Sequence, residues 1–298
     1  MTGAAARPGT SDTTRGAFLV LAAAALFSTG GAALKSPTLT NWQVAGARGA
    51  IAAVAMLLMV PAARRAWSSR TLLVGCAYAA TLLTFAFSTR LTTAANAIFL
   101  QSTAPLWMLL LSPWLLRETI RRSDVVFMAV LAIGLSLFFV GREEAVATAP
   151  NPVLGNVLGA VSGLTWALAV SGLRWLAKGE KADGAAAGAT VAGNVICFLA
   201  CLPFAWGAWT APGGAGTAHD WTALAFLGVV QVALAYVCLT RGIRRIPAFE
   251  ASLLLLLEPV LNPVWAWLVH GERPGAWALT GGAIILVATA AHTLAARR

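Results

Sequence analysis

The sequence predicts an all-α membrane protein with ten transmembrane helices arranged as two inverted five-helix repeats. Three observations predict this fold: 59% of the 298 residues are hydrophobic, only 11% are charged, and the apolar residues gather in ten long runs. A soluble domain carries about 25% charged residues, so the composition excludes a soluble enzyme. Ten spans of roughly 20 residues would use about 200 residues, which leaves little for any extramembrane domain.

The runs of the first half follow a short basic segment and are separated by charged residues, proline and glycine. They are predicted at residues 17–34, 42–60, 71–89, 95–115 and 124–141. The first run could be a cleavable signal sequence, because Arg7 and Arg15 precede it. A shift of 139 residues aligns it with the sixth run, with Gly16 on Gly155 and Phe27 on Trp166, which indicates that it is retained. Each run must be a helix, because an unpaired backbone group in hydrocarbon costs several kcal/mol.

The runs of the second half have similar lengths and boundaries. They are predicted at residues 153–173, 186–206, 221–240, 249–269 and 276–294. The sequence therefore divides into a cytoplasmic tail, a first repeat, an external connection and a second repeat. Their predicted limits are 1–15, 16–141, 142–152 and 153–298.

Most positive charges fall on one side of the predicted topology. With the N-terminus in the cytoplasm, sixteen of the 21 Lys and Arg residues lie on the cytoplasmic side and Arg48 lies within a span. The four on the opposite side are Lys35, Arg90, Arg142 and Arg273. Basic residues concentrate in cytoplasmic loops, so we expect a bacterial inner (plasma) membrane protein with both termini inside. This topology, with the lipid bilayer as partner, explains the net charge of +10 without nucleic acid.

Two segments of the chain correspond at a shift of 154 residues. AIFLQSTAPLWMLLLSPWLLRE aligns with ASLLLLLEPVLNPVWAWLVHGE, which places Pro105 on Pro259 and Glu118 on Glu272. Because each repeat has an odd number of spans, the two copies are predicted to enter the membrane from opposite sides. Inverted repeats of this kind build a site near the bilayer midplane that opens to each side in turn.

At these residues the sequence resembles the EamA-type branch of the drug/metabolite transporter superfamily. The strongest likeness is EPVLNPVWAWLVHGERPGAWALTGGAIIL at residues 258–286, whereas the first half keeps Pro105 but has Ala104 in place of the acidic residue. The resemblance implies ten helices in two five-helix repeats, and secondary transport, mostly export, of small metabolites such as amino acids. Aromatic amino-acid exporters of the YddG type are one branch, which deep aromatic residues favour.

Glu258 is the strongest candidate for a functional residue. A carboxylate within an apolar run is costly and usually faces a cavity, a partner or a proton pathway. The alternatives are a permanent ion pair with Arg48 and a cap on the backbone donors around Pro259. Asn262 and Trp265 follow at spacings of about one helical turn, so they extend the same helix face as candidate substrate contacts.

Two prolines predict interruptions in corresponding spans. Pro105 and Pro259 lack a backbone N–H and clash with the preceding turn, so each helix should kink there. At Pro259 the kink would expose the carbonyl oxygen of Leu255 as an acceptor. Both prolines are interpreted as hinge or cavity residues, with passive kinks as the alternative.

Further polar and aromatic side chains are predicted to face a central cavity. They are Phe27, Tyr78, Gln101, Trp107, Trp166, Gln231 and Tyr236. For Gln101 a satisfied interhelical hydrogen bond is equally consistent with the sequence, and for the aromatic rings the alternative is core packing. Gly155, Gly159 and Gly163 recur at every fourth position, which predicts close helix packing rather than ligand contact.

Arg48 is the basic residue within a predicted span. It carries a permanent charge and can hold a substrate carboxylate through two parallel hydrogen bonds. Because Arg48 lies nearer the external end of its span, snorkelling to the interface or an ion pair is the alternative.

Other classes of function leave weaker signals. The sequence contains no G-x-x-x-x-G-K-[ST] phosphate loop, no H-E-x-x-H motif and no clustered Cys and His residues. We therefore expect no catalytic residue, no cofactor and no metal, with a small molecule as the substrate. An integral-membrane enzyme would need paired acid and base groups within reach. That class and a passive channel stay as alternatives, and the sequence indicates no oligomeric state.

Overall fold

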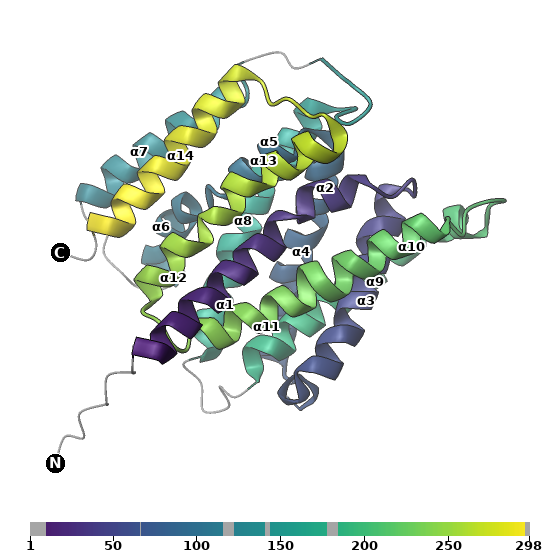
Figure 1. Ribbon diagram of the computed structural model, residues 1–298, viewed down its shortest axis with the longest axis horizontal. Coiled ribbons are helices and arrows are strands. Elements are labelled where there is room, and N and C mark those ends of the chain that lie inside the picture. Colours follow the sequence, from purple (N-terminus) through teal and green to yellow (C-terminus); the bar gives the residue numbers. More distant parts are fainter. Residues whose placement is uncertain (1–9, 66, 116–121, 141–143, 178–183, 296–298) are drawn as a thin grey trace.

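The computed structural model describes residues 10–65, 67–115, 122–140, 144–177 and 184–295, which fold into a bundle of long helices (Figure 1). Among these residues, nine helical segments are long and apolar enough to cross a membrane. They coincide with nine of the ten predicted spans to within a few residues. The remaining span, predicted at 124–141, corresponds to α7 (Arg122–Leu137), a helix of 16 residues. The prediction of an all-α membrane protein is confirmed.

The first half of the chain forms five spans, of which two are divided. Its elements are α1 (Thr10–Ser28), α2 (Gly30–Lys35), α3 (Asn41–Met59), the short 3-10 helix η1 (Pro61–Arg64), α4 (Ser69–Leu91), α5 (Ala94–Gln101), α6 (Ala104–Leu115) and α7. A capping box formed by Thr40 and Gln43 starts α3, and the side chains of Ser68 and Thr93 cap α4 and α5. These side chains satisfy backbone N–H groups at helix starts.

The second half repeats the order of spans. Its elements are α8 (Pro152–Ala177), α9 (Ala185–Thr210), α10 (Ala218–Ala225), the π-helical η2 (Phe226–Leu234), α11 (Ala235–Gly242), α12 (Ala248–Leu255), α13 (Leu257–His270) and α14 (Ala276–Ala295). The eighth span consists of α10, η2 and α11, and the ninth consists of α12 and α13. The first nine residues of the predicted tail, together with Glu118 and Arg142, lie outside the described residues.

The predicted interruptions at Pro105 and Pro259 are both present. The fourth span divides into α5 and α6 after Gln101, and the ninth divides into α12 and α13 after Leu255. In each case the helix stops four residues before the proline. The missing N–H of the proline would have bonded the carbonyl group of that residue, which accounts for both breaks, whereas Pro203 and Pro263 lie inside continuous helices.

Two further irregularities were not expected from the sequence. Where α1 gives way to α2, the hydroxyl groups of Ser28 and Thr29 each donate to the carbonyl oxygen three residues earlier, at 2.7 Å. Side chains that bond backbone carbonyl groups in this way bend helices. The eighth span contains η2, which includes Gln231, and π-helical segments frequently occur at functional sites.

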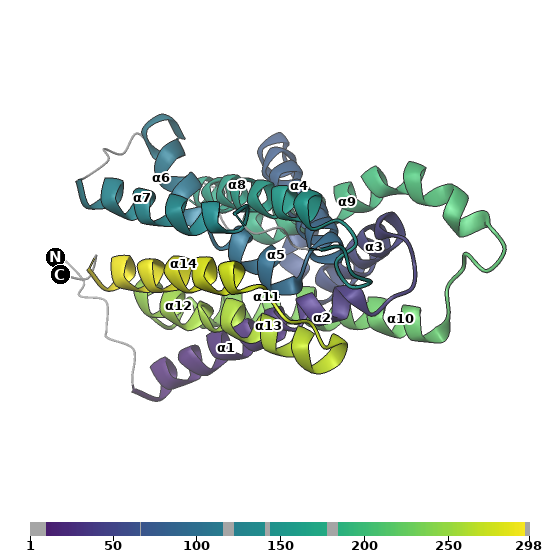
Figure 2. The same cartoon turned by 90° about the horizontal axis from the view of Figure 1, so that it is seen from above.

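The two halves pack on each other through equivalent pairs of spans. The third span of each half contacts the first span of the other, since α4 packs on α8 and α11 packs on α1. The fourth span does the same, since α5 and α6 pack on α8 while α12 and α13 pack on α1. The second, fourth and fifth spans also contact their own counterparts, as α7 and α14 show side by side in Figures 1 and 2. This pattern is expected of two similar units related by a two-fold axis.

Helix α8 approaches α4 and α5 along the predicted glycine ridge. A Cβ atom would lie 2.6 Å from Thr92 if placed on Gly155, and 2.9 Å from Ser88 if placed on Gly159. Gly163 is equally confined by the break between α5 and α6. The prediction of close helix packing at these glycines is therefore confirmed.

The beginning of α1 and the end of α14 lie at the same end of the bundle, on the left of Figures 1 and 2. This end is named the Arg245 end, after a residue between α11 and α12. The opposite end, where α2 ends and α5 begins, is named the Lys35 end, after the last residue of α2.

Candidate functional site

Most of the residues predicted to bind substrate lie near the middle of their spans, whereas Tyr236 and Trp265 lie nearer the ends of theirs. They form two groups, which we name after their charged members. The Arg48 group consists of Arg48 in α3, Tyr78 in α4, Trp166 in α8 and Tyr236 in α11. The Glu258 group consists of Phe27 in α1, Gln231 in η2, and Glu258, Asn262 and Trp265 in α13.

Arg48 is buried in the contact between α3 and α9, where it is 3% exposed. Two glycines of α3 permit this contact. A Cβ atom on Gly46 would lie 2.8 Å from Cys201, and a Cβ atom on Gly49 would lie 2.8 Å from the carbonyl oxygen of Asn194. The helices therefore approach closely enough to enclose the arginine between them.

The guanidinium group of Arg48 has no counter-charge among the described residues. Its electrostatic neighbours are Tyr78, Cys197 and Cys201. Its Nε atom is enclosed and forms no hydrogen bond with any residue that the structure describes. The alternative in which Arg48 snorkels to the interface is wrong, because helix packing encloses the side chain. The alternative of an ion pair with Glu258 is also not found in the described part of the chain.

Both tyrosines of the chain lie in the Arg48 group. The ring of Tyr78 lies 6.3 Å from the ring of Trp166, at an interplanar angle of 50°. The same tyrosine interacts electrostatically with both Arg48 and Tyr236, and Tyr236 lies beside Thr190 of α9. The group therefore combines a fixed positive charge, two hydroxyl groups and an aromatic surface.

Gln101 and Trp107 meet the inner face of α8. The side-chain amide of Gln101 donates to Ser162 Oγ at 2.8 Å, which is the interhelical hydrogen bond that the sequence left open. The indole Nε1 of Trp107 is enclosed, has no hydrogen-bond partner in the described part of the chain, and lies close to Gly163. Whether either side chain contacts substrate stays a prediction.

Most of the Glu258 group is engaged with α1 and α2. Gln231 donates to the carbonyl oxygen of Phe27 at 3.4 Å, and Trp265 donates to Ser28 Oγ at 2.9 Å. Asn262 is 0% exposed and lies so close to Gly31 that a Cβ atom there would come within 2.2 Å of its oxygen. These side chains hold the divided first span against η2 and α13.

Glu258 itself lies in the first turn of α13, directly before the buried Pro259. The break at Leu256 thus creates a helix N-terminus in the middle of the span, and the dipole of a helix favours negative charge there. Glu258 is partly exposed, and within the described residues it forms no ion pair. The break therefore places a carboxylate at a helix N-terminus near the middle of the ninth span.

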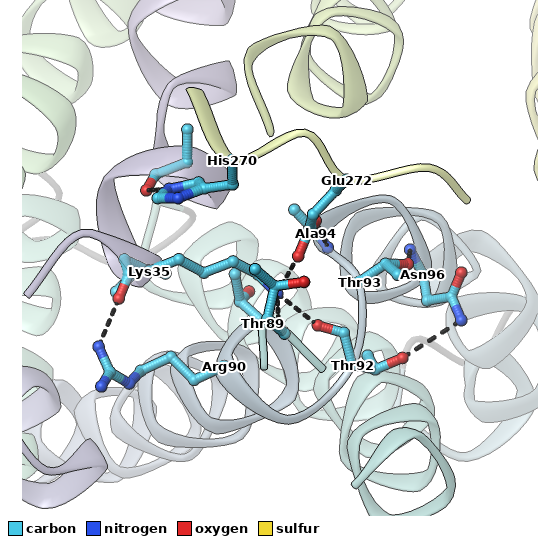
Figure 3. A network of polar contacts seen from close by, with 12 residues as sticks. Lys35, Thr89, Arg90, Thr92, Thr93, Ala94, Asn96, His270 and Glu272 are labelled. Carbon is cyan, nitrogen blue, oxygen red and sulfur yellow. Dashed lines mark hydrogen bonds and ion pairs between the residues drawn. The ribbon is translucent and has the colours of Figure 1, made fainter. Parts of the chain in front are cut away.

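A buried ion pair at the Lys35 end was missed by sequence reasoning (Figure 3). Lys35 pairs with Glu272, which follows α13, and the two side chains are 5% and 2% exposed. The ammonium group also donates to the carbonyl oxygens of Thr92, at 2.7 Å, and of Thr148. Glu272 accepts from the backbone N–H of Ala94 at 2.9 Å. The pair therefore ties the first and ninth spans to the start of α5.

One signal in the sequence pointed toward this pair. The predicted topology places Lys35 and Glu272 on the same side of the membrane, where few charged residues lie. Because the partners come from opposite halves of the chain, their contact depends on the packing of the repeats, which no local pattern reveals.

A second network at the same end fixes the loop between α2 and α3. Arg90 of α4 donates to the carbonyl oxygen of Leu39 at 2.7 Å, to Asn41 Oδ1 at 2.6 Å and to two further carbonyl oxygens. Asp220, at the start of α10, accepts from the backbone N–H of Thr38 at 2.6 Å. The Lys35 end is thus closed by several hydrogen-bonded loops.

An apolar groove lies between α3, α9 and α10. Its lining includes Trp42, Phe198, Leu202, Trp209 and Trp221. A site for a polar metabolite needs a few placed polar groups, so this groove is a poorer candidate than the Arg48 and Glu258 groups.

Two similar sets of membrane-spanning helices, with polar side chains buried near mid-span, define a multi-pass membrane transporter. Residues 14–140 and 153–293 match the model of the EamA-like transporter family. The chain belongs to this family, as its resemblance to the EamA-type branch implied, and the family fold consists of ten helices in repeats.

Two curated relatives are the pseudopaline exporters CntI of Pseudomonas aeruginosa strains UCBPP-PA14 and PAO1. Each is 31% identical over 93 residues, and the match spans 31% of this chain and 31% of the relative. A solved structure described as the crystal structure of a protein has a TM-score of 0.59 and 19% identity, covering 96% of this chain and 98% of that chain. The latter similarity supports the fold alone.

Proposed function

We propose that the protein is a secondary carrier that exports small amphipathic metabolites, above all amino acids, by alternating access to a central site. The observation that best supports this is the equivalent packing of the two halves, in which the first span of each half lies against the third and fourth spans of the other. Inverted repeats packed in this way can exchange two forms, each open to one side. The partial match to pseudopaline exporters favours export without selecting amino acids.

The proposed repeats are residues 16–141 and 153–298, joined by the external connection 142–152. Both termini are proposed to be cytoplasmic, because most Lys and Arg residues then lie inside. The Arg245 end becomes the cytoplasmic end and the Lys35 end the external one, facing away from the cytoplasm of a bacterium.

In this proposal the pair of Lys35 and Glu272 closes the external end. Both side chains are buried there, and release of substrate to the outside requires them to separate and become hydrated. The breaks before Pro105 and Pro259 supply the hinges, because a divided helix can change its angle without losing internal hydrogen bonds.

The substrate is proposed to bind between the two groups at mid-span. Gln101 and Trp107 are proposed to line this site on the side of α8, and the rings of Tyr78 and Trp166 offer a surface for an aromatic side chain. Aromatic amino acids are therefore the first substrates to test.

Purified protein in liposomes loaded with labelled phenylalanine tests the proposed function. A carrier gives saturable efflux, and external unlabelled phenylalanine accelerates it by counterflow. An aromatic preference predicts that unlabelled tryptophan competes. Unsaturable conductance would indicate a channel, and turnover of a lipid or peptide without net flux would indicate an enzyme.

Proton coupling through Glu258 is a further part of the proposal. An imposed pH gradient should change the rate of efflux in the wild type, and Glu258→Gln should abolish this response. Glu250→Gln is the matched control, because Glu250 lies one helix earlier, at the start of α12. If the pH gradient changes the rate of efflux neither in the wild type nor in Glu258→Gln, proton coupling at Glu258 is excluded.

A further inference from the structure

We infer that Arg48 binds a carboxylate of the transported molecule, so that the substrate class is small free acids with an apolar or aromatic body. This inference rests on the proposed function. Beyond that function, it names the substrate group that is recognised, the residue that recognises it, and the related molecules that should not bind.

The charge of Arg48 is not balanced by the residues that the structure describes. Arginine keeps its proton under all ordinary conditions, and a buried charge without a partner is strongly unfavourable. Arg48 is 3% exposed, yet no carboxylate in the described part of the chain pairs with it. Its neighbours Tyr78, Cys197 and Cys201 carry no charge in their ordinary forms. The structure therefore holds a positive site that an anion from outside the chain would complete.

The nitrogens of Arg48 differ in how far they are enclosed. The Nε atom of Arg48 is fully enclosed, whereas the two terminal nitrogens are neither hydrogen-bonded within the described residues nor fully enclosed. These two nitrogens form the fork that binds a carboxylate through parallel hydrogen bonds. Tyr78 interacts electrostatically with Arg48, and its hydroxyl group is able to donate a hydrogen bond to an anion.

Aromatic side chains near Arg48 suit the rest of the substrate. The ring of Trp166 lies 6.3 Å from the ring of Tyr78, so an apolar group attached to the carboxylate meets aromatic faces. An isolated phosphate or sulfate would leave this surface empty. A carboxylate joined to a flat or apolar body satisfies both parts of the site.

The experiment uses three probes that differ only in their end group: phenylacetate, phenylacetamide and phenethylamine. The full chain is purified in an uncharged detergent, and the ligand-induced shift in its unfolding temperature is measured for each probe. Ligands that bind the folded state raise this temperature. Phenylacetate should raise it at concentrations at which the amide and the amine do not.

Variants identify the residue responsible. Arg48→Gln should remove the preference for phenylacetate, and Arg48→Lys should weaken binding about tenfold, because one of two charge-assisted hydrogen bonds is lost. Arg70→Gln is the matched control, because it removes one positive charge from a residue that stacks on Trp175 at 5.0 Å. This control should bind phenylacetate as the wild type does.

The inference is overturned if phenylacetamide binds as tightly as phenylacetate, a comparison that needs only the wild type and so survives a variant that fails to fold. It is also overturned if Arg48→Gln keeps the preference, or if added phosphatidylglycerol displaces phenylacetate, since the anion would then be a lipid headgroup. The proposed function is judged separately by flux in liposomes. Saturable flux without a preference for carboxylates would support the proposed carrier function and overturn the inference about Arg48.

Discussion

The two ends of the bundle hold their charges in different ways. At the Lys35 end, Lys35 and Glu272 are 5% and 2% exposed, and each also bonds to backbone groups. At the Arg245 end, among the residues that the structure describes, Arg245 pairs with Asp12 at 3.2 Å, and the two side chains are 29% and 52% exposed. One contact is a buried network, and the other is a surface ion pair.

This difference in burial indicates which end of the bundle has the higher barrier to opening. A buried charge has lost its hydration, so it is stable only while its partners are in place. An exposed pair exchanges its partner for water at little cost. We therefore expect the Lys35 end to open in one concerted step and the Arg245 end to open with a lower barrier.

Glu272→Gln should have the largest effect, because it leaves the ammonium group of Lys35 buried without a counter-charge. Breaking a buried pair in this way costs about 3–5 kcal/mol, so the unfolding temperature in detergent should fall. The Lys35 end should also open more often. A membrane-impermeant maleimide should then react faster with a cysteine introduced as Thr148→Cys.

The matched control combines Lys35→Met with Glu272→Gln. Removing both charges of a buried pair is often close to neutral, and the glutamine oxygen can still accept from Ala94. The double variant should therefore recover most of the lost unfolding temperature. Equal losses in the single and double variants would mean that packing, and not charge, holds this end together.

Arg90→Gln should have an intermediate effect. It removes a charged donor from the loop between α2 and α3, and a hydrogen bond to a charged group contributes about 1.5–3 kcal/mol. Thermal unfolding should show a loss of this order, and protease should cut residues 36–40 more readily. Arg90→Lys should fall between the two, because one ammonium group cannot reach every acceptor. An unchanged cutting rate in Arg90→Gln would contradict this role.

Asp12→Asn should have the smallest effect. Exposed ion pairs contribute about 0–1 kcal/mol and weaken in salt, so the unfolding temperature should barely change and should match that of the wild type at high salt. The rate at which the maleimide labels Thr148→Cys should be the same with and without Asp12→Asn. A loss as large as that of Glu272→Gln would erase the difference between the two ends.

The sequence predicts most of the fold because its signals are local. The length and hydrophobicity of each run place the spans, and the missing N–H groups of Pro105 and Pro259 place two breaks. The bend at Ser28 and Thr29 was not predicted, because the same hydroxyl groups fit a straight helix equally well. The π-helical stretch around Gln231 depends on how η2 packs against its neighbours, and it leaves no mark in composition.

The site was predicted in its residue types but not in its contacts. The exposure of Arg48 was predicted from its distance to the end of its span. Its burial instead depends on Gly46 and Gly49, which allow α9 to approach α3 closely. Lys35 and Glu272 each resemble an ordinary charge at the edge of the membrane. Their pairing becomes visible only when the first and ninth spans are brought together.

Helix α5 connects the ion pair of Lys35 and Glu272 to the break in the fourth span. Its eight residues form a rod about 12 Å long. At the first residue of α5, the backbone N–H of Ala94 donates a hydrogen bond to Glu272. At its last residue, the side chain of Gln101 donates to Ser162, beside the break before Pro105. Hydration of the buried Glu272 carboxylate would release the first residue of α5, while the last residue of the same helix stays bonded to α8 near the middle of the fourth span.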